Sequence, residues 1–322
     1  MTAGQFQDWQ TITDFGLLKS WTVGCIRDST LLHSILDIHP FQQLTRLTLV
    51  LRPRDDEDLE FWRAAGSMFK SLPPLTYLRL FGTYTPAFLN GQVLSQHGST
   101  LLTLELDSTK FDRKTMYMHR PIGQIGPIFS NEDVVELAGQ CLSLQKLSIC
   151  FQRYQGLETG TWTAFGRFPC LRELDVILSC IPEMNADMMP VPPRELSEFE
   201  KSLIVHPSRN ISCPKWFIRD CIINFVINES LAKEYFTHIG ACQDAECLTQ
   251  LVIYPSIDQY HSQTSGGRYF IGDHFFSEMA LIWTVERKFP TGLLATSRKR
   301  SINTRIRNEF AEEASSSILL SM

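Results

Sequence analysis

The chain has 322 residues, of which 43% are hydrophobic and 20% charged, and its formal net charge is −5. This length suits one or two globular domains or a single array of about nine repeats. The modest negative charge gives no reason to expect a nucleic acid as the general partner. No apolar run approaches the roughly 18 residues of a membrane-spanning helix, and the N-terminus lacks the regions of a signal peptide. We therefore expect a cytoplasmic or nuclear protein with no membrane partner.

Residues 1–17 are polar with scattered aromatic side chains, and we expect them to cap a repeat array or to end a preceding helix. Beyond them the chain repeats the spacing L-x-x-L-x-L, whose second and third apolar positions point to one side of a strand. The copies begin at Leu18, Leu44, Leu75, Leu101, Leu144, Leu171, Ile222 and Leu248. Four of the seven intervals between these first positions are 26 or 27 residues, which is typical of leucine-rich repeats.

Helices are expected between the strands. The clearest one starts at Ser130, a suitable N-cap, and carries Glu132 and Asp133 in its first turn, where the helix dipole favours negative charge. The acidic run Asp55–Glu60 marks the start of another helix for the same reason. Further helices are expected over 28–36, 85–96, 230–238 and 273–288, the last with an apolar face that would seal the C-terminal end.

Two segments fit neither the periodicity of a helix nor that of a strand. Residues 110–128 mix basic, aromatic, Gly and Pro residues, and both a contact loop and an insertion without a role agree with this composition. Residues 181–215 contain six prolines, which break any long element, and a degenerate strand is expected near 203–205.

These patterns predict an α/β leucine-rich-repeat solenoid that is curved, with parallel strands on the concave face and helices on the convex face. The solenoid is expected to span residues 18–289, between the N-terminal cap or remnant, 1–17, and a basic C-terminal tail, 290–322. The cluster around Arg298 and Lys299 in that tail favours a solvated terminal helix, and a nuclear address is the alternative.

Motifs for catalysis, phosphate binding and metal ligation are missing from the sequence. It has no G-x-x-x-x-G-K-[ST], G-x-G-x-x-G, G-x-S-x-G or H-E-x-x-H, and its eight histidines include no i, i+4 pair. Its nine cysteines include no C-x-x-C pair and are expected to be reduced thiols that pack as small hydrophobic groups. We therefore expect no enzyme, no cofactor and no metal.

The residues that alternate with the core positions of each strand would form columns on the concave face. Tyr, Phe and Arg are common in binding hot spots, and the acidic residues would set charge complementarity with a protein partner. The candidate protein-binding residues are Arg46, Tyr77, Arg79, Phe81, Glu105, Asp107, Lys146, Glu173 and Asp175. The alternative is that these strand positions are polar only because they face water.

The repeats, with cysteine beside several of them, resemble the cysteine-containing repeats of fungal F-box/leucine-rich-repeat proteins. The segments LKSWTVGCIRDSTLLHSI (18–35) and LIWTVERKFPTG (281–292) are similar to sequences of that family. The resemblance implies that the repeats choose a ubiquitination substrate, while an N-terminal F-box recruits the Skp adaptor of a cullin-type ligase. No L-P-x-E-type F-box precedes the first repeat. A stand-alone repeat scaffold or binding protein outside the ubiquitin pathway is therefore the alternative, and an enzyme is a third.

Overall fold

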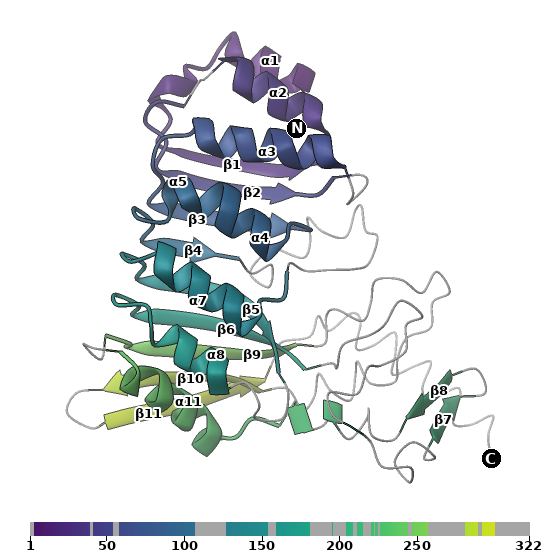
Figure 1. Cartoon of the computed structure of the whole chain (residues 1–322), viewed down its shortest axis with the longest axis vertical. Coiled ribbons are helices and arrows are strands. Elements are labelled where there is room, and N and C mark those ends of the chain that lie inside the picture. Colours follow the sequence, from purple (N-terminus) through teal and green to yellow (C-terminus); the bar gives the residue numbers. More distant parts are fainter. Residues whose placement is uncertain are drawn as a thin grey trace.

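A computed structural model describes most of the chain. The described residues are 3–38, 41–53, 58–106, 127–153, 159–180, 195, 204–208, 211–214, 220–221, 223–224, 226–243, 247–256, 281–288 and 292–299. They form an α/β structure with an open, uncurled sheet and one layer of helices (Figure 1).

Nine strands within these ranges belong to the main sheet, in the order β1-β2-β3-β4-β5-β6-β9-β10-β11. Strands β1 to β6 and β9 are parallel to one another, and β10 and β11 run antiparallel to their neighbours. Their bounds are β1 Ser20–Ile26, β2 Arg46–Leu51, β3 Tyr77–Gly82, β4 Thr103–Glu105, β5 Lys146–Gln152, β6 Glu173–Ser179, β9 Gln250–Ser256, β10 Leu281–Lys288 and β11 Gly292–Lys299.

The predicted repeat spacing is confirmed by the strand register in seven of its eight copies. The middle core residue of each copy pairs with the same position of the next one, in the row Trp21, Leu47, Leu78, Leu104, Leu147, Leu174, Leu251. These residues are almost completely buried. The period of the sequence therefore places one strand per repeat, each in register with its neighbours.

Every one of these repeats after the first also enters its strand with the same pair of hydrogen bonds. The backbone N–H groups of Thr45 and Arg46 both donate to the carbonyl oxygen of Lys19, at 3.0 Å each. The next repeat does the same, with Thr76 and Tyr77 donating to Thr45, and the pattern continues to Thr249 and Gln250, which donate to Arg172. These shared hydrogen bonds fix the register of the strands, because they join the start of each strand to the start of the preceding one.

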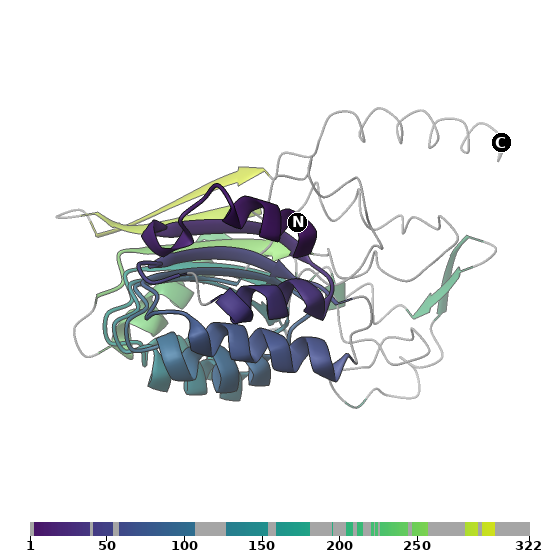
Figure 2. The ribbon, with the colours of Figure 1, turned by 90° about the horizontal axis from the view of Figure 1, so that it is seen from above.

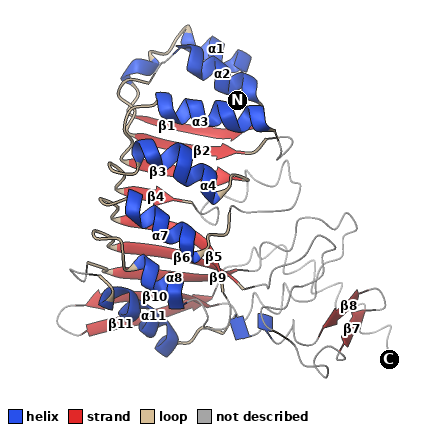
Figure 3. Cartoon of the chain, viewed as in Figure 1, coloured by secondary structure: helices blue, strands red, loops and turns tan. Residues whose placement is uncertain are grey.

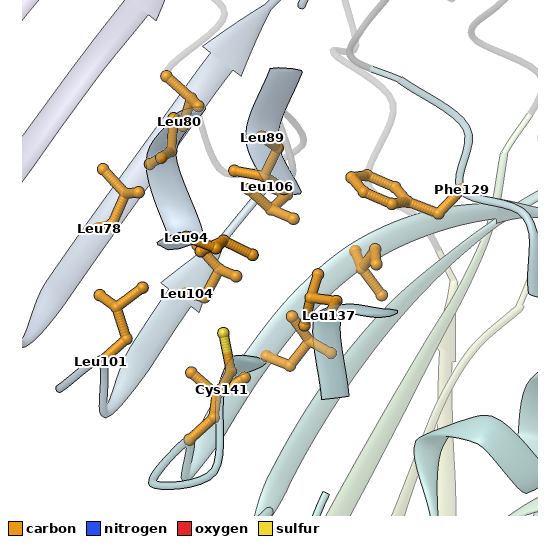
Figure 4. Close-up of a cluster of buried hydrophobic side chains, with 14 of the residues drawn as sticks. Leu78, Leu80, Leu89, Leu94, Leu101, Leu104, Leu106, Phe129, Leu137 and Cys141 are labelled. Carbon is orange, nitrogen blue, oxygen red and sulfur yellow. The ribbon is translucent and has the colours of Figure 1, made fainter. Parts of the chain in front are cut away.

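The helices between the strands cover one face of the sheet (Figures 2 and 3). They are α2 Ser29–Ile38, α3 Leu59–Ser71, the helical segment formed by α4 Pro86–Phe88, the π-helix η2 Leu89–Leu94 and α5 Ser95–His97, and then α7 Asn131–Gln140, α8 Thr159–Phe165 and α11 Glu229–Ala241. Leucines of the strands pack against apolar side chains of this layer. Leu104 of β4, for example, lies beside Leu94 of η2 (Figure 4). The core lies between the two layers.

The helix starts agree with the capping signals in the sequence. The Ser130 side chain accepts a hydrogen bond from the backbone N–H of Asp133, and the Asp133 carboxylate accepts one from the backbone N–H of Ser130. Asp58, at the end of the acidic run, caps α3 by accepting from the N–H of Phe61. Residues 54–57 of that run lie outside the described residues.

An aromatic cluster closes the core at the β1 end of the sheet. Phe6 of α1 (Ala3–Gln10) and Phe15 of the 3-10 helix η1 (Phe15–Leu17) pack on each other, with ring centroids 5.1 Å apart. Trp21 and Phe41 complete the cluster, with centroids 4.5 Å apart. These ring contacts place Phe6 and Phe15 over the core beside β1.

The expected helix over 273–288 is wrong for its described part. Residues 281–288 are strand β10, in which Ile282, Trp283 and Val285 are buried and the Trp283 indole N–H donates to the carbonyl oxygen of Ile227 at 2.7 Å. Strand β11 follows within the segment expected to be a tail, so Arg298 and Lys299 lie on a strand and not on a helix. The free edge of β9 explains the difference, because hydrogen bonds along that edge favour the extended conformation.

Among the described residues, no strand of the main sheet corresponds to the eighth predicted copy, Ile222, Phe225, Ile227. β6 pairs directly with β9, and residues 220, 221, 223 and 224 are helical. Asn224 is buried there and donates from its side chain to the carbonyl oxygen of Cys180 at 3.2 Å. An apolar pair at i, i+3 also fits one face of a helix, so the spacing alone could not decide.

The degenerate strand expected near 203–205 corresponds to β7 (Ile204–Ser208). It lies outside the main sheet, because it pairs antiparallel with β8 (Ile211–Pro214) in a separate two-stranded sheet. The segment 110–128, interpreted as either a contact loop or an insertion without a role, falls almost entirely outside the described residues, which resume at Pro127.

Candidate functional site

The face of the sheet opposite the helix layer, called here the helix-free face, carries the candidate residues. Side chains alternate along a strand, so the positions between the buried leucines point to this face. Two rows are aligned by the register: Ser20, Arg46, Tyr77, Thr103, Lys146, Glu173, Gln250 and Thr22, Thr48, Arg79, Glu105, Ser148, Asp175, Val252. A third row contains Val50 and Phe81, and strict alternation along β1 would add Gly24 to it. A register shift after Thr22 instead places Cys25 opposite Val50.

Four of the charged members of these rows form two ion pairs between register neighbours. Arg79 Nε lies 3.2 Å from Glu105 Oε2, and Lys146 Nζ lies 2.5 Å from Glu173 Oε2. Both pairs join directly opposed positions of adjacent strands. The Arg79–Glu105 pair is the more protected from water, with side chains 20% and 12% exposed, so it is screened less than a fully exposed ion pair.

An arginine guanidinium lies over each of two aromatic rings on this face, those of Tyr77 and Phe81. The Arg46 guanidinium carbon is 4.3 Å from the centroid of the Tyr77 ring, and the Arg79 guanidinium carbon is 4.9 Å from that of Phe81. Burial raises the pKa of Tyr77, and the charge and hydrogen bond of Glu105 act in the same direction, while Arg79 and Arg46 oppose the shift. The tyrosine is therefore neutral at physiological pH and offers a ring that is only partly covered.

Exposure divides the predicted site residues into two groups. Arg46 is exposed, and Tyr77, Arg79, Glu105, Lys146 and Glu173 are partly exposed. Phe81 and Asp175 are buried, each with 3% of its surface exposed, although both were expected to face a partner. Asp107 lies outside the described residues. The accessible candidates are therefore those of the two rows on β2 to β6, without Phe81 and Asp175.

One part of this face was missed because 281–288 was expected to be a helix. Gln250 of β9 donates to Glu286 Oε1 of β10 at 3.0 Å, and Lys288 Nζ lies 2.6 Å from Glu286 Oε2. The hydrogen bonds from Lys288 and Gln250, together with the charge of Lys288, lower the pKa of Glu286. The alternation of apolar Trp283 and Val285 with polar Thr284 and Glu286 was the available signal for a strand.

The described residues offer few groups for other chemistry. They contain no group of three or more His, Cys, Asp or Glu side chains placed to hold a metal ion. Eight of the nine cysteines are recorded as free thiols, and burial raises the pKa of Cys141 to about 12, which keeps that thiol protonated and unreactive. No helix in this part of the chain is both long and apolar enough to cross a membrane.

Comparison with protein-family models, curated proteins and solved structures finds no significant match for this chain. The function therefore has to be argued from the helix-free face itself.

Proposed function

We propose that the chain is a leucine-rich-repeat solenoid that binds a protein partner on the helix-free face. The observation that carries the proposal is the ladder of cross-strand contacts Arg46–Tyr77, Arg79–Glu105 and Lys146–Glu173, all on one face of register-aligned strands. The same pair of hydrogen bonds at the start of each strand from β2 to β6 and of β9 supports the repeat architecture.

A rigid polar and aromatic surface of this kind suits protein recognition. The sheet fixes the backbone, and each side chain of the ladder is held by its neighbour, so little conformational entropy remains to be lost on binding. Tyr and Arg are the residue types that contribute most in hot spots, and the adjacent charges select a partner of complementary charge. In this proposal the chain has no catalytic role.

The partner class follows from the resemblance to F-box/leucine-rich-repeat proteins. We propose a ubiquitination substrate as the partner, with the chain as the recognition part of a ligase receptor. Recruitment of Skp adaptor and cullin distinguishes this role from that of a stand-alone binding protein with the same face.

The test is affinity capture from the native cell extract with quantitative mass spectrometry. Wild type is compared with Arg46→Ala/Tyr77→Ala on the helix-free face and with Arg63→Ala/Lys70→Ala, two exposed positions of α3 in the helix layer. Phe81→Ala is unsuitable, because truncating a buried phenylalanine costs about 3–5 kcal/mol of folding free energy. Thermal melts confirm that both variants are folded.

We expect a partner that the wild type and the α3 variant retain and the Arg46/Tyr77 variant loses, with a binding deficit of about 1–4 kcal/mol for the purified pair. Skp adaptor and cullin in the same eluate support the ligase role, and their absence beside such a partner supports the stand-alone role. If both variants retain every protein that the wild type captures, the helix-free face is not the binding surface.

A further inference from the structure

We infer that the partner presents an acidic, extended peptide segment to the β1–β3 end of the helix-free face, where Arg46 binds its carboxylate. This inference rests on the proposed function and adds the chemistry of the partner. It starts from an asymmetry between the cations of this face.

Arg79 and Lys146 each have a carboxylate on the adjacent strand, Glu105 and Glu173 respectively. Arg46 has none within the described part of the chain, and the contact recorded for its guanidinium is with the ring of Tyr77. Arg46 is also the exposed member of the candidate set, whereas the two paired cations are partly covered. The positive charge that is still available on these strands therefore lies on β2.

The geometry at Arg46 suits a carboxylate. A guanidinium stacked on an aromatic ring still presents its N–H edge outward, and that edge matches the two oxygens of a carboxylate. The Tyr77 ring restricts the arginine side chain, so less entropy is lost when the ion pair forms. The guanidinium of Arg79, on the same strand as Tyr77, lies over the Phe81 ring and beside Glu105, so Arg46 is the cation of this pair that has no carboxylate partner among the described residues.

The surroundings of Arg46 favour a peptide over other anionic partners. Its register neighbour on β1 is Ser20, and Thr22 and Thr48 form the adjacent row, so this end of the face offers hydroxyl groups and no acidic side chain in the two rows. Hydroxyl groups can bond the backbone of an extended segment. A nucleic acid or an anionic membrane needs several phosphate contacts from a basic patch, and two arginines, one of them already paired, do not form one.

The inference predicts a bound segment with Asp or Glu at the position that contacts Arg46 and an apolar or aromatic residue over the Tyr77 ring. The full chain is used to select binders from a display library of random linear dodecapeptides. We expect enrichment of Asp and Glu among the selected peptides, and binding that weakens as NaCl is raised from about 0.05 M to about 0.3 M.

The selected peptides are then measured against three variants by fluorescence anisotropy. Arg46→Gln keeps hydrogen-bonding capacity without charge, and we expect it to bind at least about tenfold more weakly, equivalent to about 1.4 kcal/mol. Arg46→Lys keeps the charge without the planar donor edge and is expected to be intermediate. Arg63→Gln removes an exposed arginine from α3 and should bind as the wild type does.

Several results would overturn the inference. They are selected peptides without acidic enrichment, unchanged binding by Arg46→Gln, or no binder at all to the wild type. Arg46-dependent binding of phosphatidylserine vesicles in place of peptides would do the same, as would an Arg46-dependent dimer in analytical ultracentrifugation. If the extract experiment still yields a partner lost in Arg46→Ala/Tyr77→Ala, the proposed function stands and only the acidic specificity falls.

Discussion

His97 illustrates, at the scale of a residue, how the fold uses a polar side chain inside the helix layer. It is completely buried at the end of α5, where its Nε2 lies 3.0 Å from the carbonyl oxygen of Phe69 on α3. Its Nδ1 is buried without a hydrogen-bond partner in the described structure. The ring thus joins two helices of adjacent repeats while it is neutral, and burial lowers the pKa of His97.

This shift predicts a loss of stability in mild acid. In the unfolded chain His97 takes up a proton near its ordinary pKa of about 6.5, whereas the folded chain resists protonation to a lower pH. Stability is therefore complete above about pH 6.5 and falls as the pH decreases towards the folded pKa, with a slope of at most about 1.4 kcal/mol per pH unit. Urea unfolding at several pH values measures this dependence of the free energy of unfolding on pH.

The control for this prediction is a substitution of the histidine itself. His97→Gln removes the titrating group and should flatten the acid slope, at some cost in stability at neutral pH. Equal acid slopes for His97→Gln and the wild type would show that His97 does not contribute.

At the scale of an element, α7 shows local sequence and tertiary structure in agreement. Its capping box joins Ser130 and Asp133, and Val134, Leu137 and Ala138 form the buried side of the helix. Strand β10 shows the opposite case. Apolar residues at helical spacing led to an expected helix, but β9 offered an edge, and the antiparallel pairing of β10 with it decided the conformation. Local pattern is decisive only where no neighbouring edge competes with it.

The capping box of α7 gives a prediction for this element. Ser130→Ala removes the acceptor for the backbone N–H of Asp133 and should lower the free energy of unfolding by about 1 kcal/mol. Ser67→Ala, at an exposed interior position of α3, should raise it slightly, since alanine has the higher helix propensity. Chemical denaturation measures the free energy of unfolding of both variants. Equal stability of Ser130→Ala and the wild type would show that this cap does not stabilise the protein.

At the scale of the whole molecule, the two ends of the main sheet are closed by different means. Phe6 and Phe15 cover the core beside β1, while the opposite end is completed by the antiparallel strands β10 and β11. Each repeat contacts mainly its neighbours. A destabilising substitution at one end should therefore lower the local stability of nearby repeats more than that of distant ones. A protein with a single central core would respond as one unit.

Trp283 tests this behaviour. It is 8% exposed and bonds the carbonyl oxygen of Ile227, so Trp283→Ala should cost about 3–5 kcal/mol locally. Hydrogen exchange should show reduced protection in β9, β10 and α11, with β1 to β3 unchanged. Leu47→Ala, in the buried row of β2, should produce the reverse distribution. A uniform loss of protection in either variant would contradict nearest-neighbour coupling.

The sequence by itself determined the repeating unit. Seven of its eight L-x-x-L-x-L copies became register-aligned strands, and the caps at Asp58 and Ser130 were readable because both depend on residues close together in the chain. It also determined which side chains of the rows share one face, because alternation in a strand is local.

Only the tertiary structure decided the rest. The helical conformation of residues 220, 221, 223 and 224, the strand at 281–288 and the burial of Phe81 and Asp175 depend on contacts with residues distant in the sequence. The same is true of the pairs Arg79–Glu105 and Lys146–Glu173, which join separate repeats and leave Arg46 as the exposed cation of the site. Pairing, burial and charge neutralisation are set across the sheet, and a pattern along one strand cannot encode them.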